Sequence, residues 1–359
     1  MDDICDLVQE YISIQSFSAS QYISTENLIP NRGGVQPSLE YPTTAIGLRY
    51  KPGDILISNI RPYLKKIWLA SHNGACSTDI IVLRSRGEVS SQLLYHLLSR
   101  DNFFTYVMNN AVGTKMPRGD KQIIRLYPVA FPCDKRQQEI IIKILSSVDK
   151  KILLTRKTLE KYESIKKATV NLLLKPKEGW QEIQIGNVCQ EVHERVSCSE
   201  LTINTYISTE NLVPERQGIV PASSVPIGIN AIRFQRNDIL VSNIRPYLKK
   251  IWYADFWGGC SNDVIVYRAN EKVNPRFLFH LLSQDAFFNF AMDNATGTKM
   301  PRGDRKLLQL FAISIPSSLS EQEQISISID KLSLILDNIY KSIKKLEKHK
   351  HSLLQYFFN

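Results

Sequence analysis

Hydrophobic positions repeat along this chain on two scales, a short one within single elements and a long one between its two halves. Runs such as Asp54–Ser58 and Asp79–Leu83, bounded by Gly, Pro and Asn, predict short strands. Leu126–Phe131, closed by Pro132, predicts another strand. Apolar residues recur near helical spacing in Ser91–Asn110, which predicts a helix. The short pattern therefore indicates mixed α and β structure.

Two longer stretches carry apolar residues at alternating spacings of three and four. One begins near Gln137 and ends before Pro176, and the other covers residues 321–359. Such spacing over about five heptads, with Lys and Glu between, predicts a coiled coil. The alternative, an amphipathic helix lying on its own globular domain, explains the length poorly. The predicted seam residues are Ile141, Leu145, Val148, Ile152, Leu159, Ile325, Ile329, Leu332, Leu336, Ile339, Ile343 and Leu346.

The two halves of the chain are copies of one another. YISTENL occurs at 22–28 and 206–212, SNIRPYLKKIW at 58–68 and 242–252, and GTKMPRGD at 113–120 and 297–304. All three pairs share an offset of 184 residues, so the chain is a tandem duplication. Met1 aligns with Ile185, so we expect copy one to lack a counterpart of Gly179–Gln184.

Together these patterns predict an α+β protein with two mixed α/β domains separated by two long helices. We expect domains at 1–136 and 176–320 and helices at 137–175 and 321–359. The helices should form an antiparallel coiled coil, because only then are two direct repeats related by a pseudo-two-fold axis. Lys166 and Lys350 are matching polar breaks in the seam and are predicted to fix its register. Leu353–Asn359 is expected to end near the start of copy one.

Charge narrows the class of partner. The formal net charge is +10 over 359 residues, and a basic protein favours a polyanionic partner, most often nucleic acid. We see no membrane-spanning run and no secretory signal, so a cytoplasmic location is expected. The six cysteines lack zinc-binding spacing, and no metal site is expected.

The identical blocks carry the candidate DNA contacts. Lys and Arg neutralise phosphates, and Arg and Asn can also bind base edges. Alternatively, some of these charges solvate a face or pair with Asp54, Asp79 and Asp120. Tyr22–Asn27 stays open between a contact and plain sheet. The predicted DNA-binding residues are Ser58, Asn59, Arg61, Tyr63, Lys65, Lys66, Lys115, Arg118, Lys121, Ser242, Asn243, Arg245, Tyr247, Lys249, Lys250, Lys299, Arg302 and Arg305.

Little in the sequence indicates catalysis. Asn59–Tyr63 superficially resembles the Asn-Pro-Pro-Tyr element of amino-group DNA methyltransferases, but Arg61 replaces its first Pro and no glycine-rich cofactor loop accompanies it. There is no GxxxxGK[ST] motif for ATP. His96 and His280 lie in apolar helical runs and are predicted to be packed. We expect no catalytic residue and no cofactor in this chain.

The order of elements resembles that of type I restriction–modification specificity subunits, in which a target-recognition domain alternates with a long helix, twice. Their domains open like Gly179–Cys189, and a Pro-terminated strand leads into a Gln-Glu-Gln helix, as in Ile313–Pro316 followed by Glu321–Gln324. GTKMPRGD resembles a late motif of some recognition domains. The resemblance implies a non-catalytic subunit whose two domains each read half of a bipartite site in double-stranded DNA.

The resemblance also implies partners. The helices would hold the domains at a fixed spacing and dock two methyltransferase subunits that use S-adenosylmethionine to methylate adenine. A restriction subunit using ATP and Mg is a further expected partner, so cofactors are expected only in partner subunits. Two alternatives stay open: the specificity subunit of a type IIB-like methylating nuclease, and a coiled-coil DNA-binding regulator without a methyltransferase.

The likeness of the copies predicts similar half-sites in inverted order, and hence a nearly palindromic, interrupted target. The copies differ most at Asn31–Tyr50 against Glu215–Phe234, and at Leu69–Gly74 against Tyr253–Gly258. Any difference between the half-sites is expected to arise there.

Overall fold

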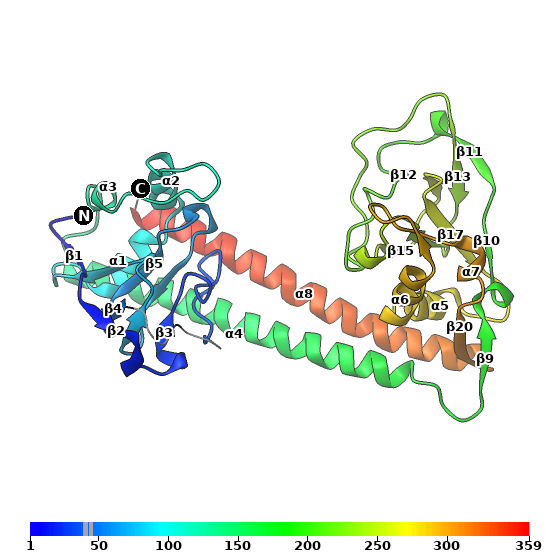
Figure 1. Cartoon of the computed structure of the whole chain (residues 1–359), viewed down its shortest axis with the longest axis horizontal. Coiled ribbons are helices and arrows are strands. Elements are labelled where there is room, and N and C mark those ends of the chain that lie inside the picture. The colour runs from blue at the N-terminus through cyan, green and yellow to red at the C-terminus, as the bar shows by residue number, and fades with distance from the viewer. Residues whose placement is uncertain (39–41, 43–45, 359) are drawn as a thin grey trace. The chain divides into compact units, whose positions relative to one another are not determined.

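A computed structural model describes residues 1–38, 42 and 46–358 of the chain. The chain forms two compact units: unit 1 is Met1–Thr158 with Ile339–Asn359, and unit 2 is Leu159–Asn338. Each unit combines one copy of the repeat with half of each long helix (Figure 1). Both long helices are therefore shared between the two units.

Two four-stranded sheets form the centre of the domain in unit 1. The strands are β1 Cys5–Leu7, β2 Tyr11–Ser13, β3 Tyr22–Ile23, β4 Ile46–Tyr50, β5 Ile55–Ser58, β6 Ile67–Leu69, β7 Gly74–Cys76 and β8 Ile80–Ser85. The first sheet has the order β1-β8-β5-β6 and is antiparallel throughout. The second has the order β2-β4-β7-β3, and its edge strand β3 runs parallel to β7. Tyr22–Ile23 is thus plain sheet.

The central strand β5 explains why the two sheets stack. Ile55 and Ile57 point into one core together with the helices of the domain, whereas Leu56 points into another core with the second sheet. Alternate side chains of a strand face opposite sides, so a strand buried on both faces is apolar throughout. The domain consequently has three layers: helices, first sheet and second sheet.

The predicted helix Ser91–Asn110 is in fact two helices, α1 Ser91–Leu98 and α2 Asp101–Asn109, and the single-helix prediction is wrong. The Ser99 hydroxyl donates to the Tyr95 carbonyl at 2.6 Å, and Arg100 takes an extended backbone conformation before α2. The Ser99 carbonyl accepts a hydrogen bond from the Arg32 side chain. The break therefore supplies a tertiary hydrogen bond that an unbroken helix would not offer.

Unit 2 repeats this architecture, with sheet orders β10-β17-β14-β15 and β11-β13-β16-β12. A short α3 Lys121–Arg125 in unit 1 corresponds to α7 in unit 2. The elements of unit 2 are β9 Trp180–Gln184, β10 Cys189–Glu191, β11 Arg195–Ser197, β12 Tyr206–Ile207, β13 Asn230–Phe234, β14 Ile239–Ser242, β15 Ile251–Tyr253, β16 Gly258–Cys260, β17 Val264–Ala269, α5 Pro275–Leu282, α6 Asp285–Asp293, β18 Ala295–Thr296, β19 Arg302–Gly303, α7 Arg305–Leu308 and β20 Ala312–Pro316.

The strand predicted at Leu126–Phe131 does not form, and this prediction is wrong. Its counterpart in unit 2, β20, pairs antiparallel with β9. Among the described residues, 128–132 pair with no strand. Instead, the Tyr127 carbonyl accepts a hydrogen bond from the amino group of Met1 at 3.0 Å.

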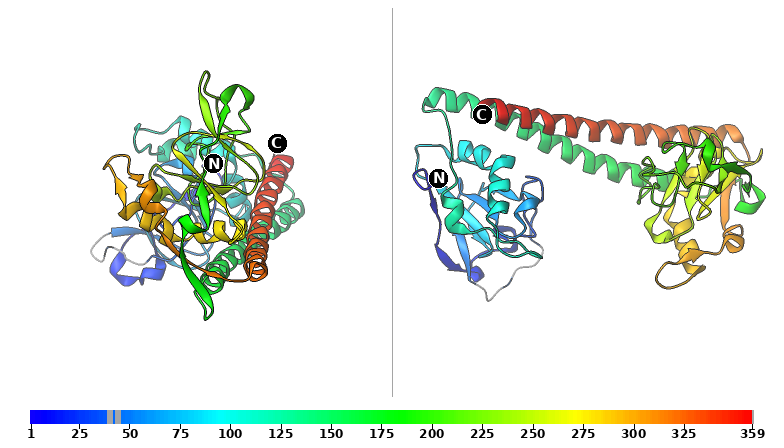
Figure 2. Two further views of the ribbon diagram at one scale, coloured as in Figure 1. Left: turned by 90° about the vertical axis from the view of Figure 1, so that its right-hand side faces the viewer. Right: turned by 90° about the horizontal axis from the view of Figure 1, so that it is seen from above.

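The long helices are α4 Lys135–Leu173 and α8 Leu319–Phe358. In unit 1 they run antiparallel: Arg156 binds Glu347 at 2.6 Å, and Asp149, two turns earlier in α4, binds Lys350 (Figure 2). In unit 2, Leu174 shares a core with Ile325 and Ile329 of α8. All twelve predicted seam residues are buried or half-buried.

The C-terminal end of α8 completes the core of unit 1. Leu354 and Phe358 are buried there with Ile4 and Tyr127. In unit 2, Leu174, which aligns with Phe358, occupies the corresponding core. The end of each long helix thus packs on the domain of the other copy.

His96 and His280 are packed residues, as predicted. In unit 1, His96 Nε2 lies 3.3 Å from the Ser146 hydroxyl of α4, and burial lowers the pKa of His96 to about 4. In unit 2, His280 Nε2 lies 3.0 Å from Asp330 Oδ1 of α8, and burial likewise lowers its pKa. Each histidine joins its domain to a long helix.

Candidate nucleic-acid interface

The three blocks that are identical in both copies meet in one place in unit 1. The Arg61 amide donates to the Pro117 carbonyl at 2.9 Å, and the Gly119 amide donates to the Asn59 carbonyl at 3.1 Å. The Lys66 ammonium donates to the Thr25 carbonyl at 2.7 Å. We term these loops, residues 24–32, 59–66 and 112–120, the loop cluster of unit 1; in unit 2 it comprises 208–216, 243–250 and 296–304.

The loop cluster follows the carboxyl ends of neighbouring strands. Because β3 and β7 run parallel, Thr25 and Asp79 follow them at the same edge of the sheet. Arg118 reaches this edge, with its guanidinium 3.4 Å from the Asp79 carboxylate. Ion pairs between exposed groups are weak, so Arg118 is available to exchange Asp79 for another acceptor.

Arg61 adopts a left-handed backbone conformation, with φ 51°. This conformation is unfavourable for residues other than glycine and costs on the order of 1–3 kcal/mol. The hydrogen bond to Pro117 and the one from the Leu64 amide to the Arg61 carbonyl, 2.9 Å, hold it. The backbone therefore turns the Arg61 side chain outward, where it is exposed.

Only part of the predicted DNA-binding set is exposed on the loop cluster. Tyr63 is 50% exposed, and Met116, which follows Lys115 and which sequence reasoning missed, is 47% exposed. A cluster of cations with an exposed aromatic ring suits phosphates and bases. The exposed members of the predicted set are Arg61, Tyr63, Lys115, Arg118, Arg245, Tyr247, Lys299 and Arg302.

Other predicted residues hold the loops together instead. The Ser58 hydroxyl donates to the Ile60 carbonyl at 3.0 Å, and Lys65 binds Asp101 at 2.6 Å. The Lys66 ammonium donates to the Thr25 carbonyl, and desolvation lowers the pKa of Lys66. We assign these side chains a structural role, and the same holds for their counterparts Ser242, Lys249 and Lys250.

Lys121 and Arg305 occupy equivalent positions but differ in their contacts. Arg305 pairs with Glu191 and donates to the Asn262 carbonyl, so its charge is compensated inside the domain. Lys121 reaches only the Thr78 carbonyl, at 3.5 Å. Arg305 is therefore paired within its own domain, whereas Lys121 stays a candidate contact.

Asn59 and Asn243 keep a buried side-chain oxygen without a hydrogen-bond partner among the described residues. A Cβ atom at Gly119 would lie 3.0 Å from Asn59 Oδ1, and one at Gly303 would lie equally close to Asn243 Oδ1. Only glycine leaves this amide room to turn. This oxygen therefore lies inside the loop cluster, against the glycine backbone, and not on the exposed surface of the cluster.

The acidic residues considered as alternative partners have separate roles. Asp54 is buried and binds Arg84 through two hydrogen bonds of 2.7 Å, away from the loop cluster. The Asp120 carboxylate caps α3 by accepting from the Gln122 amide at 2.8 Å. Of the three, Asp79 alone pairs with a candidate contact, Arg118.

Arg32 is a further residue that sequence reasoning missed. Its guanidinium binds Asp101 at 2.5 Å, and its amide donates to the Lys65 carbonyl at 2.9 Å. Its counterpart Arg216 binds Asp285 in the same way. The sequence signal that could have found Arg32 is its identity with Arg216 at the 184-residue offset, within the Asn31–Tyr50 segment where the copies differ most. Residues 39–41 and 43–45 of this segment lie outside the described residues.

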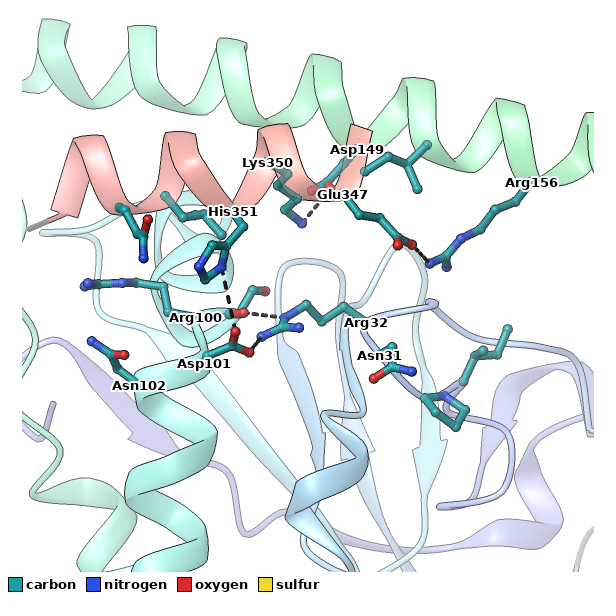
Figure 3. A pocket seen from close by; sticks show the side chains of 16 residues that line it. Asn31, Arg32, Arg100, Asp101, Asn102, Asp149, Arg156, Glu347, Lys350 and His351 are labelled. Atoms are coloured by element: carbon teal, nitrogen blue, oxygen red, sulfur yellow. Dashed lines mark hydrogen bonds and ion pairs between the residues drawn. The ribbon is translucent and has the colours of Figure 1, made fainter. Parts of the chain in front are cut away.

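One flank of the loop cluster faces the long helices of unit 1. There a cavity of about 500 Å³ lies between Asn31 and Arg32, the α1–α2 junction, and α4 with α8 (Figure 3). Ion pairs cross it or border it: His351 lies 3.7 Å from Asp101, and Arg156 binds Glu347. This flank is therefore turned toward protein.

Within residues 1–38, 42 and 46–358, no helix combines the length and apolar character needed to cross a membrane. The same part of the chain holds no group of three or more His, Cys, Asp or Glu side chains placed to bind a metal ion.

Comparison with known proteins identifies the repeated unit. The family model of the type I restriction modification DNA specificity domain matches residues 40–164 and 177–348, one match in each copy. The matches cover well over half of the chain. This chain belongs to the type I restriction modification DNA specificity domain family.

Individual family members are distant in sequence. The EcoDI specificity subunit of the type I restriction enzyme from Escherichia coli is 31% identical over 122 residues, which are 34% of this chain and 27% of that protein. The match thus spans about a quarter of that relative's length.

Solved structures share the fold of the whole chain. The type I restriction-modification S subunit from M. genitalium has a TM-score of 0.64 at 16% identity, covering 100% of this chain and 94% of that chain. A chain from a structure on complex assembly and conformational transition of the type I R-M system has a TM-score of 0.55 at 17% identity, covering 100% and 96%. Both support the same arrangement of secondary structure elements.

Proposed function

We propose that this chain is the DNA-reading, non-catalytic specificity subunit of a type I-like restriction–modification complex. The observation that carries the proposal is the loop cluster, which presents the same exposed cations and tyrosine in both specificity domains. Family membership supports the same role. Each domain would read one half of a bipartite site in double-stranded DNA.

The loop cluster offers two kinds of contact. Lys115 and Lys299 extend as exposed point charges that suit phosphate. Arg118 and Arg302 are only weakly paired and can fork onto guanine. Phosphate contacts would position the domain and base contacts would specify the sequence.

The long helices are the proposed docking surface for methyltransferase subunits. Leu153 and Leu154 of α4 are about half exposed in unit 1, and Leu334 of α8 is 59% exposed in unit 2. Apolar side chains left on a charged helix surface are typical of a partner interface. S-adenosylmethionine, ATP and Mg would then be bound by the partner subunits, two methyltransferases and a restriction subunit.

Purification of the tagged full-length chain from its native host tests this function. We expect a larger protein with an Asn-Pro-Pro-Tyr element to co-purify and the complex to methylate host DNA. Leu154→Asp should release the partner while leaving the chain folded, and Tyr11→Asp, at a 66% exposed position outside the long helices, serves as its control. A chain that binds its DNA with full affinity and retains no methyltransferase would support the regulator instead.

A further inference from the structure

Five exposed side chains are identical in the two loop clusters, whereas Val112 corresponds to Thr296 and Asn31 to Glu215. Arg61, Lys115 and Arg118 correspond to Arg245, Lys299 and Arg302. Their exposure is matched too: Tyr63 and Tyr247 are 50% and 49% exposed, and Met116 and Met300 are 47% and 48% exposed. Both domains thus offer DNA the same donors, ring and apolar group.

The backbone that presents these side chains is also duplicated. Arg61 and Arg245 share a φ of 51°, and each donates its amide to the equivalent proline carbonyl, at 2.9 and 2.8 Å. Arg118 lies 3.4 Å from Asp79, and Arg302 lies 3.2 Å from Asp263. Equal side chains on an equal backbone present equal hydrogen-bonding geometry to a base edge.

Outside the loop clusters, a large exposed difference lies at the other end of the same strands. Trp257, which is 50% exposed, precedes β16, and its counterpart Asn73 precedes β7. Ile203 likewise precedes β12, which runs parallel to β16. The loop clusters follow the carboxyl ends of these strands, so Trp257 and Ile203 lie at the opposite edge of the sheet.

A second difference lies within the loop cluster. Asn31 corresponds to Glu215, and the amide of each donates to the equivalent leucine carbonyl, at 2.8 and 2.9 Å. In unit 1 the Asn31 side chain lines the cavity against the long helices (Figure 3). In unit 1 this position therefore belongs to the flank of the cluster next to the long helices.

We propose that both specificity domains recognise the same short DNA sequence, so that the target contains one half-site twice. The proposal rests on the proposed function and deepens it. It assigns base reading to the duplicated loop clusters and excludes the amino ends of β7 and β16, with Asn73 and Trp257, from it.

The test is methylation mapping of the native host carrying the wild-type gene, a deletion, Arg118→Ala or Arg302→Ala. The wild-type gene should give a bipartite motif whose two halves have the same sequence once orientation is allowed for. Each arginine variant should relax one half, raising methylation at sites mismatched there by about tenfold or more. Because the halves are equal, the two variants should yield indistinguishable relaxed motifs.

Exchange variants provide the matched control. Asn73→Trp and Trp257→Asn make the amino-end positions alike and should leave the motif unchanged. Two unrelated half-sites, or a half-site altered by either exchange, would overturn the shared-sequence proposal while the chain remained a specificity subunit. No difference in methylation between the wild-type and deletion strains would overturn the proposed function itself, and this inference with it.

Discussion

Lys350 of α8 and Asp149 of α4 form a buried ion pair, with Nζ 2.5 Å from Oδ1. Lys350 interrupts an otherwise apolar seam and is only 7% exposed. Its counterpart Lys166 lies in unit 2, where Asp337 and Asp330 oppose the effect of burial on its pKa. The two lysines predicted to break the seam thus each meet carboxylates of the opposite helix.

Removing one partner of this pair should destabilise unit 1. Asp149→Ala leaves the Lys350 ammonium buried without its counter-charge, and we expect a loss of about 3 kcal/mol in the free energy of unfolding. The double variant Asp149→Leu with Lys350→Met should recover most of this loss. Denaturant unfolding of the purified chain measures both, and equal stability of Asp149→Ala and wild type would refute the role of the pair.

Stability should fall in mildly acidic solution because of His96. Its pKa is about 4 in the folded chain and about 6.5 when unfolded, so the unfolded chain binds more protons between these values. The contribution of uncharged His96 to the free energy of unfolding is complete above pH 6.5. It is lost as the pH falls toward 4, and the loss is about 2 kcal/mol at pH 5. Thermal unfolding across this pH range should show a smaller decline of the unfolding midpoint for His96→Gln than for the control His193→Gln at an exposed site. The same decline in both variants would contradict the assignment.

The C-terminal turn of α8 should be essential for unit 1. Leu354→Ala and Phe358→Ala each remove a buried side chain from its core and should each cost about 3 kcal/mol. Tyr356→Ala, between them but exposed, should change stability by less than about 0.5 kcal/mol. Comparable unfolding midpoints for all three variants would show that this turn does not belong to the core.

The sequence predicted the duplication, the two long helices and the strands β5 and β8 because each leaves a local or periodic trace. The break at Ser99 leaves none, since the hydrogen bond from Arg32 that favours it comes from a distant loop. The failed strand at Leu126–Phe131 has a similar cause: its pattern is strand-like, but strand formation also depends on a partner strand, which β9 provides for the counterpart β20.

The sequence blocks that form the candidate site were predictable, but which of their side chains are exposed was not. Identity at the 184-residue offset marked Arg61, Lys65 and Arg118 equally. Only tertiary structure separates them, because Asp101 is 36 residues away from Lys65 in sequence and pairs with it in space. Identity between the copies therefore indicated the candidate residues. Burial and ion pairing in the fold separate the exposed candidate contacts from the residues that hold the loops together.

This separation gives a prediction about salt. Lys115→Ala should remove one phosphate contact and reduce the slope of log affinity against log salt concentration by roughly one. Lys65→Ala removes a charge already paired with Asp101 and should leave that slope nearly unchanged. Titration of the assembled complex with its target DNA at several salt concentrations measures both. A larger change for Lys65→Ala would reverse the assignment.

The central claim is that the loop clusters bind DNA while the long helices assemble the protein. The most direct measurement is the affinity of the complex for its target DNA in the double variant Arg118→Ala with Arg302→Ala, with thermal unfolding recorded on the same sample and Leu336→Asp as the helix variant. We expect the arginine variant to lose at least about tenfold in affinity with an unchanged unfolding midpoint, and Leu336→Asp to lower that midpoint. An arginine variant that unfolds, or that binds its target as tightly as the wild type, would contradict the account.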